Sequence, residues 1–227
     1  MKIGALSLAG VLAAASSFAN NISVIYPASV NDGYWHDESG SKYDFWNGTS
    51  ASLPTHYRYF GTSDTLSWNT SFIQFDLHSI PTGALITEAT LTLYLEDSFK
   101  TGSTPNAGSI NHVADASSAT GNANQRLGGN ENVAIIDQQA LDQAHDFVVT
   151  TYVQHDIGNG YGWSCYSLNA NTDGDYSNRD AGFTVTSADA GGHKPALTIV
   201  YIPEPSSMAM GVAAVMAIAA IRRRHMG

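Results

Sequence analysis

Residues 85–95 read Leu-Ile-Thr-Glu-Ala-Thr-Leu-Thr-Leu-Tyr-Leu, and this stretch decides the fold class. Successive side chains of a strand point to opposite faces, so alternation of apolar and polar residues indicates a strand with one buried face. One predicted face carries Leu85, Thr87, Ala89, Leu91, Leu93 and Leu95. The other carries Ile86, Glu88, Thr90, Thr92 and Tyr94. The pattern predicts an antiparallel sheet with one face on the core and one wetter face.

Working outward, residues 72–77 form a second alternating segment. Its predicted inward set is Ile73, Phe75 and Leu77, and its predicted outward set is Gln74 and Asp76. Pro81-Thr82-Gly83 provides the turn between the two strands, because proline presets φ and glycine adopts the positive φ that follows. Similar short segments, separated by Gly, Asn, Asp, Ser and Pro, predict further strands at 22–26, 57–60, 110–114, 147–149, 163–168, 183–186 and 197–201.

Helical signals are few in this sequence. Residues 134–144 have weak helical spacing and predict one or two turns. A second short helix is expected to begin at a capping Thr150 or Thr151, to run through Gln154 to Ile157 and to end at Gly158. The sequence therefore predicts an all-β protein, a β-sandwich or jelly roll, in one domain over residues 20–202.

The first 19 residues are typical of a secretory signal. Lys2 is followed by an apolar run over 3–15 and then by small residues, with Ser17 and Ala19 at the two positions that signal peptidase requires to be small. We expect cleavage between Ala19 and Asn20. The alternative is a retained N-terminal helix.

The C-terminus, residues 203–227, has three parts in a fixed order. Pro203-Glu204-Pro205 comes first, an apolar run over 208–221 follows, and Arg222, Arg223 and Arg224 come last. Fourteen apolar residues are short for a free-standing span, which needs about 20. The arginines are expected to stay on the cytoplasmic side. A plain C-terminal membrane anchor is the alternative to a processed segment.

This tail resembles the PEP-CTERM sorting signal, whose signature tripeptide is Pro203-Glu204-Pro205. The resemblance implies a Gram-negative bacterium that makes an extracellular polysaccharide. It implies that an exosortase-type enzyme removes the tail near the tripeptide after a transient stay of the C-terminal helix in the inner membrane. The expected destination is the cell surface or the extracellular matrix, and the expected processing partners are signal peptidase and that exosortase-type enzyme.

The segment between the two signals is strongly acidic. It contains six Lys and Arg against 19 Asp and Glu, a net charge of −13. Such a domain repels phosphate backbones, so nucleic acid is excluded as an expected partner. Cys165 is the only cysteine, so no intramolecular disulfide is possible. It is either a small buried hydrophobe or an exposed thiol able to form an intermolecular bridge.

Residues 72–94 and the end of the chain resemble the DNRLRE domain, also described as the disaggregatase-related domain or carbohydrate-binding module family 96. The matching residues are Phe75-Asp76-Leu77, Ser79-Ile80-Pro81, Gly83, the run 89–94, Phe183, Lys194-Pro195-Ala196-Leu197 and Val200-Tyr201. The resemblance covers most of 22–201 and implies a jelly-roll sandwich and, in some members, polysaccharide binding. The chain departs from the family at Asn69, Thr70 and Ser71, where the family's eponymous basic residues stand, which puts their function in doubt here.

Catalytic motifs are lacking: the sequence has no HExxH, no GxSxG and no phosphate-binding glycine loop. The eight histidines are scattered, and we expect them on the solvated surface. His145-Asp146 and His155-Asp156 are adjacent pairs, but neighbours on a strand point to opposite faces and do not form a base–orienter couple. With 19 acidic residues, the sequence does not select a carboxylate pair for glycoside hydrolysis.

A candidate calcium loop spans residues 169–180. Oxygen-bearing side chains recur at alternate positions, and the predicted ligands are Asn169, Asn171, Asp173, Asp175 and Asp180. Gly174 provides a sharp turn, and the twelfth position is acidic, which is the spacing that wraps hard oxygens around one Ca²⁺ ion. An ordinary hairpin loop rich in Asn and Asp has a similar composition and remains the alternative.

A second candidate site is aromatic. Rings crowd a polar segment between residues 34 and 68, and the predicted carbohydrate contacts are Trp35, Tyr43, Trp46, Tyr57 and Trp68. A sugar stacks its C–H face on an aromatic plane while flanking polar groups bond its hydroxyls. The alternative is that these rings pack beneath a long loop.

Three functions are therefore open. The first is a non-enzymatic surface or matrix protein that binds carbohydrate. The second is an exported polysaccharide-degrading enzyme that uses carboxylates in a cleft, and the third is a purely structural surface protein. The lack of a catalytic motif and the small size of the domain favour the first.

Overall fold

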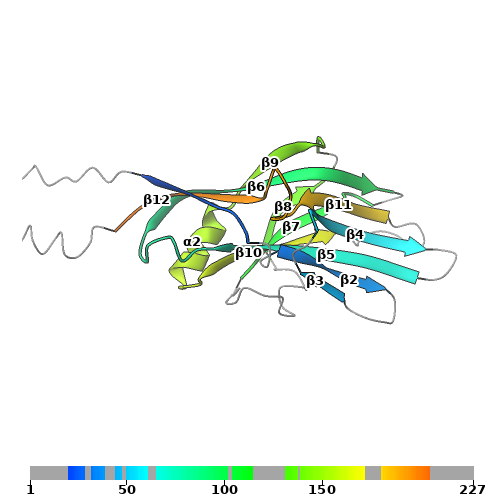
Figure 1. Ribbon diagram of the computed structural model, residues 1–227, viewed down its shortest axis with the longest axis horizontal. Coiled ribbons are helices and arrows are strands. Elements are labelled where there is room, and N and C mark those ends of the chain that lie inside the picture. The colour runs from blue at the N-terminus through cyan, green and yellow to red at the C-terminus, as the bar shows by residue number, and fades with distance from the viewer. Residues whose placement is uncertain are drawn as a thin grey trace, which may run out of the picture.

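The computed structural model describes residues 20–28, 32–38, 44–47, 50–60, 65–101, 104–114, 131–137, 139–171 and 180–204. Within these ranges twelve strands join in one sheet whose pairs are all antiparallel, accompanied by one helix (Figure 1). The all-β prediction is confirmed. The predicted signal segment and the tail from Pro205 onward lie outside the described residues. No helix within those ranges has the length and apolar character needed to cross a bilayer.

The strands and the helix have the following bounds. The first half of the chain contains β1 Asn21–Ile25, β2 Asp32–Glu38, β3 Asp44–Asn47, β4 Ser52–Phe60, β5 Thr65–Asp76 and β6 Leu85–Lys100. The second half contains β7 Gly108–Val113, β8 Glu131–Ile136, β9 Gln143–Val148, α2 Thr150–Gly158, β10 Trp163–Ala170, β11 Asp180–Thr186 and β12 Ala196–Ile202.

The two longest strands, β5 and β6, organise the sheet. Along one edge β6 pairs first with β12 and then with β11, and its other edge pairs with β9. Along one edge β5 pairs with β10 and then with β4, and its other edge pairs with β2. The sheet therefore folds back on itself in a sandwich-like way. In Figure 1 the part with β6, β9 and β12 lies above the part with β5, β2 and β3.

The core lies between these two parts of the sheet. One cluster of buried side chains draws Leu91 and Leu93 from β6, Ile199 from β12, Phe75 from β5 and Tyr166 from β10. Each of these side chains is at most 2% exposed. Burying a large apolar side chain stabilises the fold by roughly 1.5–3 kcal/mol, so this cluster is the main source of cohesion between the two parts.

The turn after β5 matches its prediction. The Ala84 N–H donates to the Pro81 carbonyl at 3.0 Å, and Gly83 adopts φ of 81° between them. Glycine has no Cβ to clash in this left-handed region, so the residue type at this position follows from the backbone.

The face assignment at the start of β6 is wrong at two residues. Leu85, predicted inward, is 61% exposed, whereas Ile86, predicted outward, is 3% exposed. The cause is a β-bulge: Val200 of β12 pairs with Glu88, but the next residue, Tyr201, pairs with Ile86, so the strand register skips Thr87. One extra residue reverses the alternation before it, which local sequence does not reveal.

The helix predicted over residues 134–144 is not formed. The segment contains the end of β8 and the start of β9, joined by a turn in which Asp142 has φ of 55°. β8 pairs with β7 and β9 pairs with β6. Pairing with strands distant in sequence outweighs a weak helical propensity.

The second predicted helix is confirmed as α2, but its predicted cap is wrong. Val149 occupies the N-cap position, and no side chain caps the helix there. The Thr150 hydroxyl instead accepts a hydrogen bond from the Ala89 N–H at 2.9 Å, in β6. This bond fastens the start of α2 to the sheet rather than to its own first turn.

Gln74 was predicted outward and is instead fully buried. Asp76 is exposed, as predicted, but Phe72 and Gln74 on the same face of β5 are at most 1% exposed. Cys165 of β10 lies opposite Gln74 in the register and is also fully buried. Of the two alternatives for Cys165, the buried one is therefore correct, and burial raises the pKa of its thiol.

Candidate functional site

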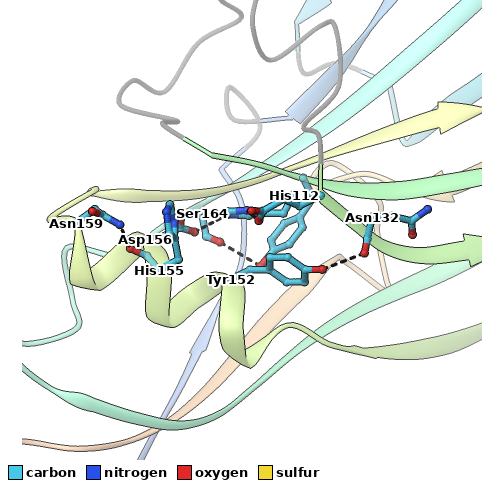
Figure 2. Close-up of polar contacts among 9 residues, drawn as sticks. His112, Asn132, Tyr152, His155, Asp156, Asn159 and Ser164 are labelled. Carbon is cyan, nitrogen blue, oxygen red and sulfur yellow. Dashed lines mark hydrogen bonds and ion pairs between the residues drawn. The ribbon is translucent and has the colours of Figure 1, made fainter.

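A buried histidine lies between two carboxylates where β7, β8 and α2 meet. His112 of β7 has no solvent exposure. Its Nε2 lies 3.0 Å from both carboxylate oxygens of Asp156 (Figure 2). Its Nδ1 lies 3.2 Å from Oε2 of Glu131. One imidazole thus bridges two carboxylates.

Three separate elements bring these groups together. His112 and Glu131 are direct cross-strand neighbours in the β7–β8 pair. Asp156 lies on α2, three residues after Val153, and these two are the fully buried residues of the helix. Because residues three apart lie on one face of a helix, Val153 anchors the face that carries Asp156 toward the sheet.

The charges of this cluster depend on one proton. Burial alone lowers the pKa of His112, but the hydrogen bonds and the negative charges of Asp156 and Glu131 outweigh it and raise the pKa above its ordinary value of 6.5. A neutral imidazole has one N–H, whereas the imidazolium has two. The observed geometry, with a carboxylate at each ring nitrogen, therefore fits the imidazolium.

Aromatic rings surround His112 on two sides. The Tyr152 ring of α2 lies 5.0 Å from the imidazole, at an interplanar angle of 33°, and the Tyr166 ring of β10 lies 5.8 Å away. The Tyr152 hydroxyl donates to the Asn132 carbonyl at 2.9 Å, and Ser164 donates to the Tyr166 hydroxyl at 3.1 Å (Figure 2). These bonds hold both rings in place beside the imidazole, which has no solvent exposure.

A surface hollow opens directly beside this cluster. Its lining residues are Glu131, Thr151, Tyr152 and His155. The side chain of Glu131 is 50% exposed and that of His155 is 42% exposed, so a carboxylate and an imidazole both reach solvent there. The hollow offers hydrogen-bonding groups and an aromatic ring. It offers no base in His112, since both ring nitrogens already face carboxylates.

Two expectations for the histidines are corrected by this geometry. His112 is buried rather than solvated. His155 and Asp156 lie on the helix predicted through Gln154 to Ile157, so the strand argument of opposite faces does not apply to them, and Nδ1 of His155 lies 3.7 Å from Oδ1 of Asp156. A signal for His112 was present: it follows Ile110 by two residues in a strand, which places both side chains on the core face.

The predicted aromatic site lies on neighbouring strands. Trp68 of β5 is the cross-strand partner of Tyr57 in β4, and β2, which carries Trp35, pairs with both β5 and β3, which carries Trp46. Tyr57 is 7% exposed and so offers no open ring, whereas Trp68 is half-buried. Tyr43 lies outside the described residues. The strand pairing thus brings the backbones of these positions together.

The predicted calcium loop lies partly outside the described residues, because Asp173 and Asp175 are not among them. The amide of Asn169 donates to Ser167, that of Asn171 donates to Asn106, and Asp180 lies 3.2 Å from the guanidinium of Arg58. Within the described part of the chain, no three His, Cys, Asp or Glu side chains are placed to hold a metal ion. The calcium site stays a prediction.

Comparison with known proteins finds no family model and no curated protein that matches this chain.

Proposed function

We propose that this chain is an exported, non-enzymatic protein of the cell envelope or exopolysaccharide matrix, and that it binds carbohydrate. The observation that carries the proposal is the hollow beside α2, which combines the Tyr152 ring with the polar side chains of Glu131, Thr151 and His155. A sugar needs an apolar surface for its C–H face and fixed polar groups for its hydroxyls, and the hollow has both.

The hydrogen bonds of His112 and Tyr152 support the non-enzymatic part of the proposal, because they occupy both side chains. A general base needs a free lone pair within reach of the proton that it removes. Both nitrogens of His112 face carboxylates, and the hydroxyl of Tyr152 donates to a backbone carbonyl. These groups are arranged to hold one another rather than to exchange protons with a ligand.

The processing signals and the finer fold belong to the same proposal. We propose a jelly-roll topology, supported by the two long strands β5 and β6, each of which pairs with two successive strands along one edge. The DNRLRE-like residues and the PEP-CTERM-like tail support delivery to the surface or matrix. Mass spectrometry of protein recovered from cells tests the delivery: the mature chain is expected to begin at Asn20 and to lack residues 208–227.

A glycan-binding assay on the purified protein tests the ligand. We expect binding to immobilised neutral or acidic polysaccharides that weakens on Tyr152→Ala. Tyr26→Ala is the matched control, because Tyr26, directly after β1, is 59% exposed and does not line the hollow. The variant Trp68→Ala tests whether the predicted aromatic site contributes to glycan binding instead. Equal binding by the wild type and Tyr152→Ala would remove the hollow from the proposal.

The same assay separates the two other functions. Incubation with polysaccharide followed by measurement of new reducing ends and of unsaturated sugars detects a degrading enzyme. We expect neither product. If the folded protein binds no glycan on a broad array, the result supports the purely structural alternative.

A further inference from the structure

The Glu131 carboxylate at the rim of the hollow is held in place by a buried side chain that a ligand does not contact. Glu131 reaches solvent, but its Oε2 is held at 3.2 Å by Nδ1 of the fully buried His112. The opposite nitrogen of His112 is held by Asp156, which is 1% exposed. The position of the exposed carboxylate is therefore decided inside the protein.

We propose that His112 is the positioning residue of this hollow: as an imidazolium it holds the Glu131 carboxylate at the rim, and loss of its proton releases that carboxylate and weakens ligand binding. This inference rests on the proposed carbohydrate-binding function and adds its regulation by pH. His112 acts through Glu131 and does not contact the ligand itself.

The number of N–H groups on the His112 ring explains why Glu131 is released. Deprotonation leaves His112 with one N–H for two carboxylates, so one carboxylate then faces a ring lone pair. An unpaired carboxylate costs far more free energy when buried than when exposed. Asp156 is buried and Glu131 is half exposed, so the remaining N–H stays on Asp156 and Glu131 turns toward water.

Other titratable groups face His112 from each element packed on it. Among the described residues, these are Tyr152, His155 and Asp156 of α2, Glu131 of β8 and Tyr166 of β10. Burial raises the pKa of Tyr166, so this tyrosine stays neutral. His155 is the second histidine at the hollow: its ring lies 6.1 Å from that of His112 and its side chain is exposed there.

Nuclear magnetic resonance tests the positioning without any ligand. In the full chain at pH 6 we expect both ring nitrogens of His112 to carry protons. As the pH rises, we expect the Glu131 carboxyl ¹³C signal to move at the same midpoint as the His112 ring signals. A His112 with one protonated nitrogen at pH 6, or a Glu131 signal that does not follow His112, would overturn the inference.

Binding of cellohexaose or chitohexaose, measured from pH 5.5 to 9 by calorimetry, tests the consequence. We expect the wild-type affinity to fall at least about tenfold across the His112 midpoint, the effect of losing one charge-assisted hydrogen bond. Glu131→Gln removes the charge at the surface without burying anything new, so its affinity is expected to be low and independent of pH. Glu88→Gln, an exposed carboxylate on β6, is the matched control and keeps the wild-type profile.

The variant His155→Gln separates the two histidines. If His112 controls binding, the His155→Gln variant keeps the midpoint of the wild-type pH profile. Loss of that midpoint in His155→Gln would show that the inference is wrong. Binding with a flat pH profile also overturns the inference and leaves the proposed function standing. No binding to any glycan at any pH, together with intact coupling in the resonance experiment, overturns the proposed function instead.

Discussion

The carboxylate of Asp32 accepts a hydrogen bond from the backbone N–H of Ala188 at 2.6 Å, across 156 residues of sequence. Asp32 is fully buried, and its Oδ1 has no hydrogen-bond partner among the described residues. Burial raises its pKa from 3.8 to about 6; the Ala188 bond opposes this rise and the nearby Asp189 adds to it. The Ala188 bond itself favours the carboxylate, but burial outweighs it, so the folded protein is more stable when this carboxyl carries its proton.

This pKa predicts a pH-dependent stability. Because the folded-state pKa lies above the unfolded value, the contribution of Asp32 is complete below pH 3.8 and is lost as the pH rises through about 6. Two pKa units correspond to about 3 kcal/mol. Asp32→Asn removes the titration, so relative to the wild type it is expected to gain up to about this amount between pH 4 and pH 7.

Urea unfolding of both proteins at pH 4, 5, 6 and 7 measures this difference. Asp189→Asn, at an exposed position next to Ala188, removes only a smaller cause of the raised Asp32 pKa and is expected to show a much smaller change. A difference between the wild type and Asp32→Asn that is constant with pH would contradict the prediction.

The pair of His112 and Asp156 predicts a large loss on truncation. Asp156→Ala leaves a buried imidazolium with one of its two partners removed, and breaking a buried pair in this way costs about 3–5 kcal/mol. Glu88→Ala, on an exposed face of β6, is expected to change the free energy of unfolding by less than about 0.5 kcal/mol. Chemical denaturation at pH 6 compares the two.

The pH dependence of the same pair has a defined direction. The raised pKa of His112 means that its contribution is complete below pH 6.5 and is lost as the pH rises through the folded-state value. The deficit of Asp156→Ala is therefore expected to shrink between pH 6 and pH 9. A deficit that grows with pH would show that the imidazole is neutral in the folded protein.

Local alternation predicts much of this fold, and the reason is visible in β6. From Ala89 to Leu95 every second residue is buried, since the strand has one face on the core throughout. The helix α2 was predictable for a similar reason, because its Gly158 end is encoded locally. Both features depend on residues within one element.

The features that the sequence did not reveal depend on a partner element distant in the chain. The bulge at Thr87 exists because Val200 and Tyr201 skip a residue, and nothing within 85–95 indicates it. The ion pair of His112 and Asp156 joins residues 44 apart, each of which looks like an ordinary surface residue type. The predicted aromatic residues lie on strands that pair, because β2 and β4 both pair with β5, but the burial of Tyr57 was not predictable. Carbohydrate contact at these residues stays a prediction.

The bulge leads to a direct test with two adjacent residues. Ile86→Ala removes a buried side chain and is expected to cost about 2–4 kcal/mol, whereas Leu85→Ala at its exposed neighbour is expected to cost less than about 0.5 kcal/mol. Without the bulge the two effects would be exchanged. Thermal unfolding of both variants measures the order, and a larger effect at Leu85 would restore simple alternation along the whole strand.

Gly108 predicts a steric requirement where β7 meets β10. A Cβ at this position would lie 2.3 Å from the Asn169 carbonyl oxygen and 2.6 Å from the Phe183 ring. Gly108→Ala forces backbone and a core ring to move, and overpacking of this kind costs about 1–3 kcal/mol.

Gly158 provides the control for that variant, because a Cβ there meets nothing within 4 Å. Gly158→Ala at the end of α2 is expected to be neutral or to stabilise by up to about 1 kcal/mol through the unfolded chain. Equal effects of the two substitutions on the melting temperature would mean that the contact at Gly108 is relieved at no cost.

Cys165 reports on the integrity of the sheet because it is the single thiol of the chain. It is fully buried, and burial raises the pKa of its thiol, so both access and thiolate formation are suppressed in the folded state. We expect an aromatic disulfide reagent at pH 8 to label it only at the rate at which the sheet opens. Asp156→Ala, which weakens the attachment of α2, is expected to speed labelling, whereas Glu88→Ala is not. Rapid, complete labelling of the wild type without denaturant would place the thiol on an accessible surface and contradict the burial of this face of β10.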